Sequence, residues 1–138
     1  MAKFNPVRYF MIAAAAVGLT IGTATAASAS LYICDPGEVC LYEGSYQGGG
    51  GAFTTQTALT PYTSYQFLNS SGLYVPGNIN DRVGSAYNNG TTGGYDKVEL
   101  FRDTNYTGGL VARFAPGLWR NNLPTFQDAG VSSHNWAK

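Results

Sequence analysis

The sequence predicts an all-β protein in which two Greek-key motifs pack as a single sandwich. Two observations support this fold class. From Glu38 onward the chain is rich in Gly, Thr, Tyr, Ser and Asn, its hydrophobic runs are short and alternating, and turn residues recur about every ten positions. In addition, one short pattern occurs twice, and a twofold repeat of short antiparallel strands is typical of paired Greek keys.

The repeated pattern consists of a hydrophobic pair, a polar excursion, a tyrosine and then glycine. It occurs at 41–49 and again at 100–109. In each copy a valine precedes the leucine by two positions, so Val39 and Leu41 share one face of a strand, as do Val98 and Leu100. The pattern therefore places one strand at the start of each half.

In the first half, we expect strands at 39–43 and 52–56, and the glycine run between them weakens the start of the second strand. Residues 59–78 are rich in tyrosine but are interrupted by proline, serine and glycine. We expect an ordered excursion there, with at most one short strand near 73–75. A polar turn at 80–85 then precedes a strand that begins at Ala86.

The second half repeats this order more clearly. Strands are expected at 97–102 and 110–114, and Leu118 and Trp119 form a short apolar contact after them. A second polar turn at 128–133 precedes a final strand through Trp136. The two Greek-key motifs are therefore expected at about 38–90 and 96–137.

The N-terminal residues predict a secretory signal peptide over 1–29. Lys3 and Arg8 precede an apolar stretch at 9–22, and small residues at 27–29 form a cleavage site. Cleavage after Ala26 fits equally well. A membrane anchor is the competing interpretation, but the apolar run is shorter than the roughly 20 residues that a spanning helix needs. We expect a secreted domain at 30–138 that is not bound to a membrane.

The charge of the mature chain argues against nucleic acid and anionic membranes as partners. Two of the eight basic residues lie in the leader, so six basic residues remain against eight acidic ones, a net charge of about −2. The mature chain has the length of one domain, and we expect a monomer.

Cys34 and Cys40 are the two cysteines, and both lie in the exported part, where oxidation is the default. We expect a disulfide between them that pins the N-terminal edge of the domain. A metal site on these thiols would need further Cys or His ligands nearby, and the single histidine is His134.

Asp128, Ser133 and His134 have the residue types of a hydrolase triad. Neighbouring strand residues face opposite sides, however, and the chain has no nucleophile elbow, so we expect no enzymatic activity and place His134 at the surface or at a strand end. Trp119 and Trp136 could form a sugar-stacking surface, although filling the core explains them better. Carbohydrate binding through exposed tyrosines stays open because residues 59–78 have no clear assignment.

The two copies of the repeat resemble the aromatic-x-x-x-aromatic-x-Gly signature of βγ-crystallin Greek keys, at 42–48 and, with one extra residue, at 101–108. The polar turns at 80–85 and 128–133 are similar to the calcium motif of the same family, one in each half. The resemblance covers the whole mature chain. It implies a βγ-crystallin-like sandwich with calcium as cofactor, and the implied ligands are Asn80, Asp81, Ser85, Asp128 and Ser132.

Each calcium motif departs from the family pattern at one ligand. Gly84 stands in place of the hydroxyl residue in the first motif, and Ala129 stands in place of the second Asn or Asp in the other. Because Ca²⁺ takes about six to eight oxygen ligands, each loss leaves a position to water. We expect weak calcium binding or none.

Residues 34–44 are similar to the opening of secreted actinobacterial peptidase inhibitors of the Streptomyces metalloproteinase-inhibitor type, which are single βγ-crystallin domains behind a signal peptide. The resemblance implies inhibition of an extracellular metalloprotease through an exposed loop. That family braces its loop with a disulfide, whereas this chain has no second cysteine pair. The loop would be held by packing alone, and its expected residues are Tyr62, Tyr65, Phe67, Leu73 and Tyr74.

Two functions follow from these observations. The leading one is a secreted metalloprotease inhibitor on a βγ-crystallin fold. The alternative is a calcium-binding extracellular structural or stress protein without inhibitory activity. An exposed, ordered excursion at 59–78 would favour inhibition, whereas a buried one would favour a structural role.

Overall fold

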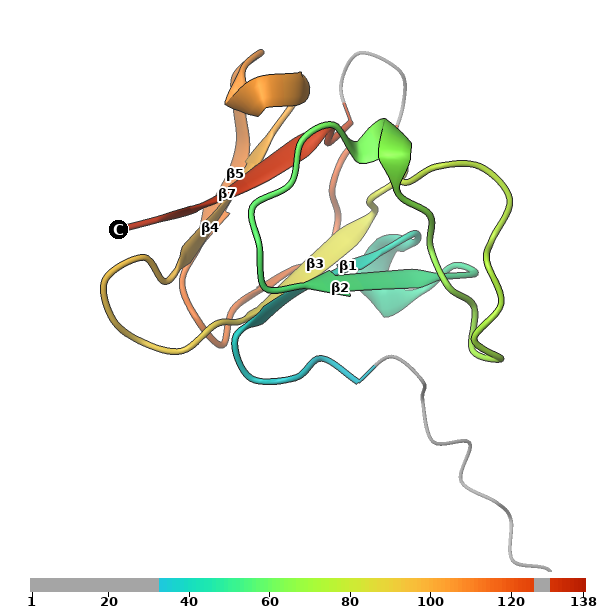
Figure 1. Cartoon of the computed structure of the whole chain (residues 1–138), viewed down its shortest axis with the longest axis horizontal. Coiled ribbons are helices and arrows are strands. Elements are labelled where there is room, and N and C mark those ends of the chain that lie inside the picture. The colour runs from blue at the N-terminus through green and yellow to red at the C-terminus, as the bar shows by residue number, and fades with distance from the viewer. Residues whose placement is uncertain (1–32, 126–129) are drawn as a thin grey trace, which may run out of the picture.

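The computed structural model describes residues 33–125 and 130–138. Within these ranges the strands form two antiparallel sheets, with orders β2-β1-β3-β6 and β5-β4-β7 (Figure 1). The strands are β1 (Glu38–Tyr42), β2 (Ala52–Thr55), β3 (Ser85–Asn89), β4 (Lys97–Phe101), β5 (Leu110–Phe114), β6 (Trp119–Arg120) and β7 (Ser133–Ala137). The predicted all-β sandwich is confirmed, and the predicted signal peptide lies outside the described residues. No helix in the described ranges has the length and apolar character of a membrane span.

The core lies between the two sheets. Val39 and Leu41 of β1 are fully buried there, as are Val98 and Leu100 of β4, which agrees with the predicted alternation. Burying one such side chain completely contributes roughly 1.5–3 kcal/mol, so these paired positions fix which face of each strand turns inward. The intervening residues of β1 belong to a second, smaller cluster.

The two halves exchange segments at the sheet edges. β6 comes from the second half but pairs with β3 of the first, at Ala86 with Arg120 and at Tyr87 with Trp119. In return, Leu59 from the first half bridges His134 of β7, and each backbone N–H donates to the other's carbonyl at 3.1 Å. Residues 118–119 were expected to form only an apolar contact, because the sequence of a very short strand does not indicate which sheet it joins.

The second cluster contains aromatic rings beside the predicted disulfide. Tyr87 and Trp119 stack with ring centroids 4.3 Å apart, and the ring of Tyr42 lies 5.8 Å from that of Trp119. Cys34 and Cys40 form the disulfide, with their Cα atoms 5.9 Å apart. Trp119 therefore packs against two tyrosines, which supports a structural role for this residue.

Each copy of the repeated pattern folds into the same tight corner. The corners contain the 3₁₀ turns η1 (Ser45–Gln47) and η3 (Thr104–Tyr106). In both turns the last two residues have positive φ angles, between 53° and 61°. Such angles are uncommon outside glycine, so the surrounding structure must hold each corner in place.

A buried serine locks each corner. The Ser85 hydroxyl donates to the Gly44 carbonyl at 2.6 Å and accepts from the Gln47 N–H at 2.9 Å. Ser133 makes the equivalent two bonds around η3, at 2.6 and 3.2 Å. Both serines are fully buried. Each hydroxyl therefore bonds two backbone groups of its corner, one as donor and one as acceptor.

Replacing Ser133 by Ala removes both hydrogen bonds between the buried hydroxyl and the corner. We expect the free energy of unfolding to fall by about 1–3 kcal/mol, measured by urea denaturation with tryptophan fluorescence. Ser70→Ala, at an exposed position, is the matched control and should change it by less than about 0.5 kcal/mol. A Ser133→Ala protein as stable as the control would contradict the locking role.

Candidate inhibitory loop

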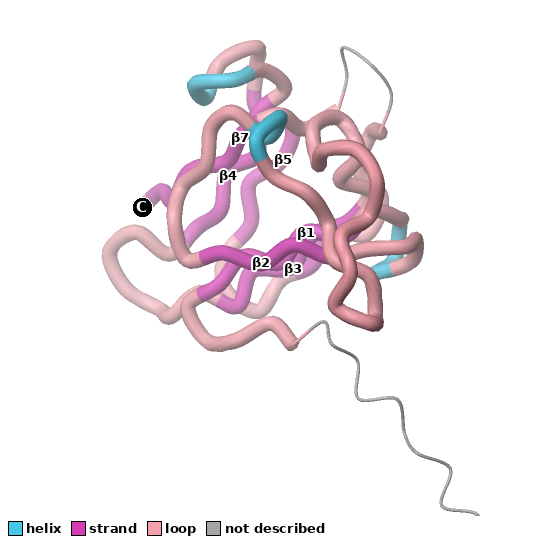
Figure 2. The backbone as a smooth tube through the Cα atoms, turned by 45° about the vertical axis from the view of Figure 1, so that its right-hand side comes forward, coloured by secondary structure: helices cyan, strands magenta, loops and turns pink. Residues whose placement is uncertain are grey.

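The connection between β2 and β3 begins with residues 57–67, here called the strap, which crosses the core. Figure 2 shows this connection as a long loop beside the two sheets. Tyr62 and Phe67 are fully buried in the main core cluster, and the Tyr62 N–H donates to the Ser132 carbonyl at 3.1 Å. The prediction that Tyr62 and Phe67 belong to an exposed loop is wrong, because these two side chains fill the space between the sheets.

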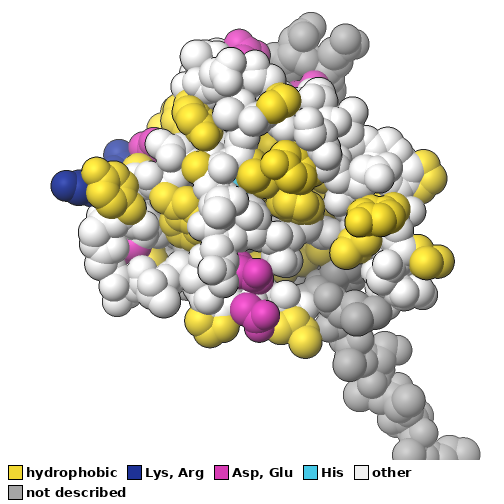
Figure 3. Space-filling view, viewed as in Figure 1, with side chains coloured by type: hydrophobic (Ala, Val, Ile, Leu, Met, Phe, Trp, Pro, Cys, Tyr) yellow, Lys and Arg dark blue, Asp and Glu magenta, His cyan; other side chains and the backbone are white. Residues whose placement is uncertain are grey.

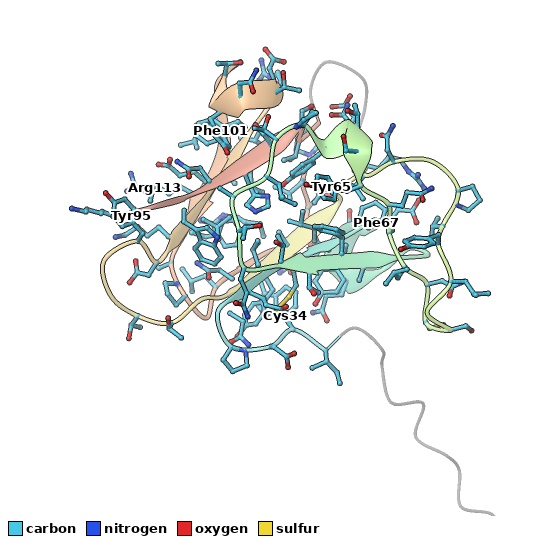
Figure 4. All side chains as sticks on the ribbon, in the orientation of Figure 1. Cys34, Tyr65, Phe67, Tyr95, Phe101 and Arg113 are labelled. Atoms are coloured by element: carbon cyan, nitrogen blue, oxygen red, sulfur yellow. A yellow bond between two sulfur atoms is a disulfide. The ribbon has the colours of Figure 1, made fainter. Side chains whose placement is uncertain are left out.

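Tyr65 lies between these two buried residues and is half-buried. Its ring packs against Phe53 of β2, with centroids 5.4 Å apart. Figure 4 shows Tyr65 and Phe67 between η2 (Tyr62–Ser64) and β2. Three of the five predicted loop residues therefore anchor the excursion to the sandwich.

Residues 67–75, here called the hairpin, stand out from the sandwich in the yellow-green loop at the right of Figure 1. Leu73 and Tyr74 are 64% and 72% exposed. At its base the Val75 N–H donates to the Phe67 carbonyl at 2.8 Å. The short strand expected near 73–75 is a single bridge between Tyr74 and Leu68.

Asn69 holds the tip of the hairpin. Its N–H donates to the Leu73 carbonyl at 2.8 Å, and its own carbonyl accepts from the Gly72 N–H at 2.9 Å. Its side-chain Oδ1 accepts from the N–H groups of Ser71 and Leu73 at 2.9 and 3.0 Å. Gly72 has a φ of 75°, which glycine adopts without strain. These hydrogen bonds fix the tip without a second disulfide.

Arg82 holds the segment that returns from the hairpin. Its Nη1 donates to the carbonyls of Pro76 and Asn78, at 2.8 and 3.1 Å, and its Nη2 pairs with Glu43 just after β1. The guanidinium also lies 5.7 Å from the centre of the Phe67 ring. A planar guanidinium can bind carbonyls and a carboxylate at once, which a lysine ammonium does less well.

His134 joins the strap to β7. It lies near the start of β7, as the strand-end alternative predicted, but it is fully buried and not at the surface. Its Nδ1 accepts from the Tyr62 hydroxyl at 2.7 Å, and its Nε2 donates to the Thr57 carbonyl at 2.9 Å. A carbonyl can only accept, so Nε2 carries a proton, and burial keeps the ring neutral with Nδ1 as the acceptor. Burial lowers the pKa of His134 to about 4, partly opposed by the Thr57 carbonyl, and burial raises the pKa of Tyr62 well above its usual range.

The first calcium-like turn meets residues of the second. The Ser132 hydroxyl lies 3.4 Å from Asp81 Oδ1, and the Asp81 N–H donates to the Val131 carbonyl at 3.0 Å. Asn80 Nδ2 donates to Asp81 Oδ2 at 2.8 Å. Asn80 Oδ1 is buried and has no hydrogen-bond partner among the described residues. Asp81 and Ser132, predicted for separate sites, therefore lie at one site.

Of the other predicted ligands within the described ranges, Ser85 does not join this site. The Ser85 hydroxyl bonds the first corner instead, and Asp128 lies outside the described residues. The cavity beside Asp81 has a volume of about 330 Å³, and Arg102 and Asp103 line it as well. The guanidinium of Arg102 opposes binding of a cation there, while the second carboxylate favours it.

Two interlocked Greek keys with paired corners define a βγ-crystallin domain. One solved structure that resembles it, described as "Evolution of the eye lens beta-gamma-crystallin domain fold", has 23% identity and a TM-score of 0.53, over 77% of this chain and 91% of that one. A βγ-crystallin from Ciona intestinalis has 20% identity and a TM-score of 0.49, over 72% of this chain and 99% of that one. No curated protein matches the sequence.

The family follows from a separate comparison. The profile of Peptidase inhibitor family I36 matches residues 27–112, which is more than half of the chain. The chain therefore belongs to this peptidase inhibitor family. The resemblance found in the residues of the repeat and of the N-terminal opening is confirmed.

Sequence analysis missed the residues that brace the hairpin. The Asn-Ser-Ser-Gly sequence at 69–72 does contain a turn signal. An asparagine side chain commonly accepts a hydrogen bond from the backbone N–H two residues further along the chain, which forms an Asx turn. The local sequence gives no indication of the role of Arg82, because its partner Glu43 is remote in sequence.

Because the folded state prefers neutral His134, its contribution to stability is complete above pH 6.5 and is lost as the pH falls from 6.5 towards 4. The loss approaches about 3 kcal/mol. As the single histidine, its ring can be followed by NMR. The folded protein should show no titration until about pH 4, while the protein unfolded in urea should titrate near pH 6.5. A midpoint near 6.5 in the folded protein would contradict the buried, neutral ring.

Proposed function

We propose that this protein is a secreted inhibitor of a metallopeptidase and that the hairpin enters the active-site cleft of its target. Membership of a peptidase inhibitor family supports the general activity. The observation that carries the proposal is the pair Leu73 and Tyr74, which is largely exposed on a hairpin that hydrogen bonds hold in one conformation. The expected signal peptide and the disulfide favour an extracellular target.

The braced hairpin would bind at low entropic cost. Ordering a flexible side chain at an interface costs about 0.5–1.5 kcal/mol, and a loop that is already ordered avoids most of this cost. Asn69 orders the tip and Arg82 orders the return segment. A substrate-like segment held in this way can occupy a cleft in extended form and resist the rearrangement that cleavage requires.

The metallopeptidase target is inferred from the N-terminal opening. Residues 34–44, which contain the disulfide, resemble the opening of inhibitors of that class. The proposed partner is therefore an extracellular metallopeptidase that binds a monomeric inhibitor, and thermolysin is a suitable probe for it.

Replacing Leu73 or Tyr74 by Ala should weaken inhibition of thermolysin. Large exposed side chains at the centre of an interface commonly contribute 2 kcal/mol or more, so we expect the inhibition constant to rise about 30-fold. Steady-state peptide hydrolysis with increasing inhibitor measures this constant. Tyr95→Ala is the matched control, because Tyr95 is 66% exposed but lies on the loop between β3 and β4.

Arg82→Lys is a second variant for the same assay. It keeps the positive charge but loses the planar guanidinium that bonds Pro76, Asn78 and Glu43. It should weaken inhibition while leaving Leu73 and Tyr74 unchanged. Wild-type protein that has no effect at micromolar concentration, where a related inhibitor works in the same assay, would refute inhibition of this enzyme class. Loss of inhibition in Tyr95→Ala alone would move the inhibitory segment to the β3–β4 loop.

A second function, calcium-dependent stabilisation of an extracellular protein, is supported by one observation. Asn80 Oδ1 is buried beside the Asp81 carboxylate and the Ser132 hydroxyl, and it has no hydrogen-bond partner in the part of the chain that the structure describes. Carboxylate, amide and hydroxyl oxygens are the donor types that Ca²⁺ prefers. A metal bound here would join the turn at 80–85 to the second half of the chain.

Bound calcium should raise the melting temperature, because a ligand that binds only the folded state stabilises it by mass action. At a concentration ten times the dissociation constant the gain is about 1.4 kcal/mol. Thermal unfolding in millimolar CaCl₂ and in EDTA measures it, and Asp81→Asn should abolish the difference. Equal midpoints in CaCl₂ and EDTA for the wild-type protein would exclude this function.

A further inference from the structure

A groove of about 280 Å³ opens between β2 and the hairpin. The residues on its walls that matter for its chemistry are Ile33, Phe53, Thr54, Gln66, Leu68 and Tyr74. None of the described residues that line the groove is charged. Figure 3 shows exposed hydrophobic side chains at the right of the face drawn there, the side on which the hairpin lies in Figure 1.

The outer side of β2 is a sheet edge that is paired only in part. β2 is the last strand in its sheet, and Ala52 exchanges two backbone hydrogen bonds with Leu68, both at 2.9 Å. The N–H and carbonyl of Ala52 therefore point away from β1. Backbone groups alternate in direction along an antiparallel strand, so those of Thr54, two residues on, also point outward.

The backbone pairing between Ala52 and Leu68 does not continue along β2 into the groove. In the same antiparallel register, the next outward pair would be Thr54 with Gln66. No hydrogen bond joins the backbones of these two residues, and both line the groove. The groove therefore combines outward backbone groups of Thr54 with an uncharged, largely apolar surface.

We propose that this groove binds an extended, uncharged segment of the target peptidase, which adds to the edge of β2 and places an apolar side chain between Phe53 and Leu68. Addition of a strand to a sheet edge gives affinity through backbone hydrogen bonds and specificity through alternate side chains. An uncharged lining disfavours charged side chains, which would lose their hydration without gaining a partner.

The peptidase is the partner because the groove continues the surface proposed to bind it. Tyr74 lines the groove and also belongs to the exposed pair on the hairpin. A protein that receives the hairpin in its cleft must therefore lie over the groove. This inference rests on the proposed inhibitory function, and it adds a second contact that determines which peptidases are bound.

The contact with an extended segment can be tested directly by NMR on the ¹⁵N-labelled mature protein. The probe is the capped peptide acetyl-Thr-Val-Leu-Val-Thr-amide. We expect saturable shifts of the Thr54 and Gln66 amide signals at millimolar peptide. The matched control is the same peptide N-methylated at alternate residues, which cannot donate these hydrogen bonds and should bind at least tenfold more weakly. An absence of shifts at Thr54 would overturn the proposal.

The contribution to inhibition can be tested with Thr54→Pro. Proline removes the outward N–H, whereas the hydrogen bonds to β1 are made by the neighbouring residues Phe53 and Thr55. We expect the inhibition constant for thermolysin to rise about tenfold, and Tyr95→Ala, which does not line the groove, to change it less than twofold. Leu68→Lys, which places a charge in the groove, should give the same loss if Thr54→Pro does not fold.

The outcomes separate this inference from the proposed function. If the wild-type protein inhibits thermolysin but Thr54→Pro and Leu68→Lys inhibit equally well, the peptidase does not use the groove. If the wild-type protein does not inhibit, the proposed function fails, while the peptide titration still decides whether the groove takes an extended strand. Binding that appears only after deletion of residues 30–32 would assign the groove to the chain's own N-terminal segment, and concentration-dependent shifts without peptide would assign it to a second copy. Either result overturns the proposal.

Discussion

The backbone bridge between Leu59 and His134 is the constraint on which the exposed hairpin depends. It carries a segment of the first half onto the second sheet, and the side chain of His134 reinforces it by bonding Tyr62 and Thr57. The strap is therefore fixed before the chain reaches Phe67. Because the hairpin begins at a buried, hydrogen-bonded residue, its orientation relative to the sheets is fixed. A loop that began at an exposed residue would be free to adopt several orientations.

Each half of the chain contributes a segment to the sheet of the other half, but the two segments differ in how much regular strand pairing they form. The second half contributes β6 to the first sheet through two residue pairs. The first half contributes a single bridge and then compensates with buried side chains, chiefly Tyr62 and Phe67. Strand pairing occupies the backbone N–H and C=O groups of a segment and keeps that segment in the sheet. A segment anchored by its side chains can instead turn away from the sheet. The half with less regular pairing is therefore the one that can present a protruding hairpin.

Much of the fold could be predicted because its signals are local. Alternation placed Val39, Leu41, Val98 and Leu100 in the core, and the repeated corner placed the turns. The loop residues were harder, because tyrosine and phenylalanine suit both a core and a binding surface, and local sequence does not tell which. Contacts between remote residues, such as Arg82 with Glu43, leave no local pattern at all.

The last serine of each calcium-like motif has a structural role that does not depend on a metal. Ser85 and Ser133 lock the two corners through identical pairs of hydrogen bonds, so the fold requires them with or without metal. Gly84 has a separate structural reason to be small: a Cβ atom there would lie 2.6 Å from the backbone of Gly44. The hydroxyl missing from the first motif is therefore excluded by the packing of the corner. The packing and hydrogen bonds of the corners therefore account for Gly84, Ser85 and Ser133 without any metal.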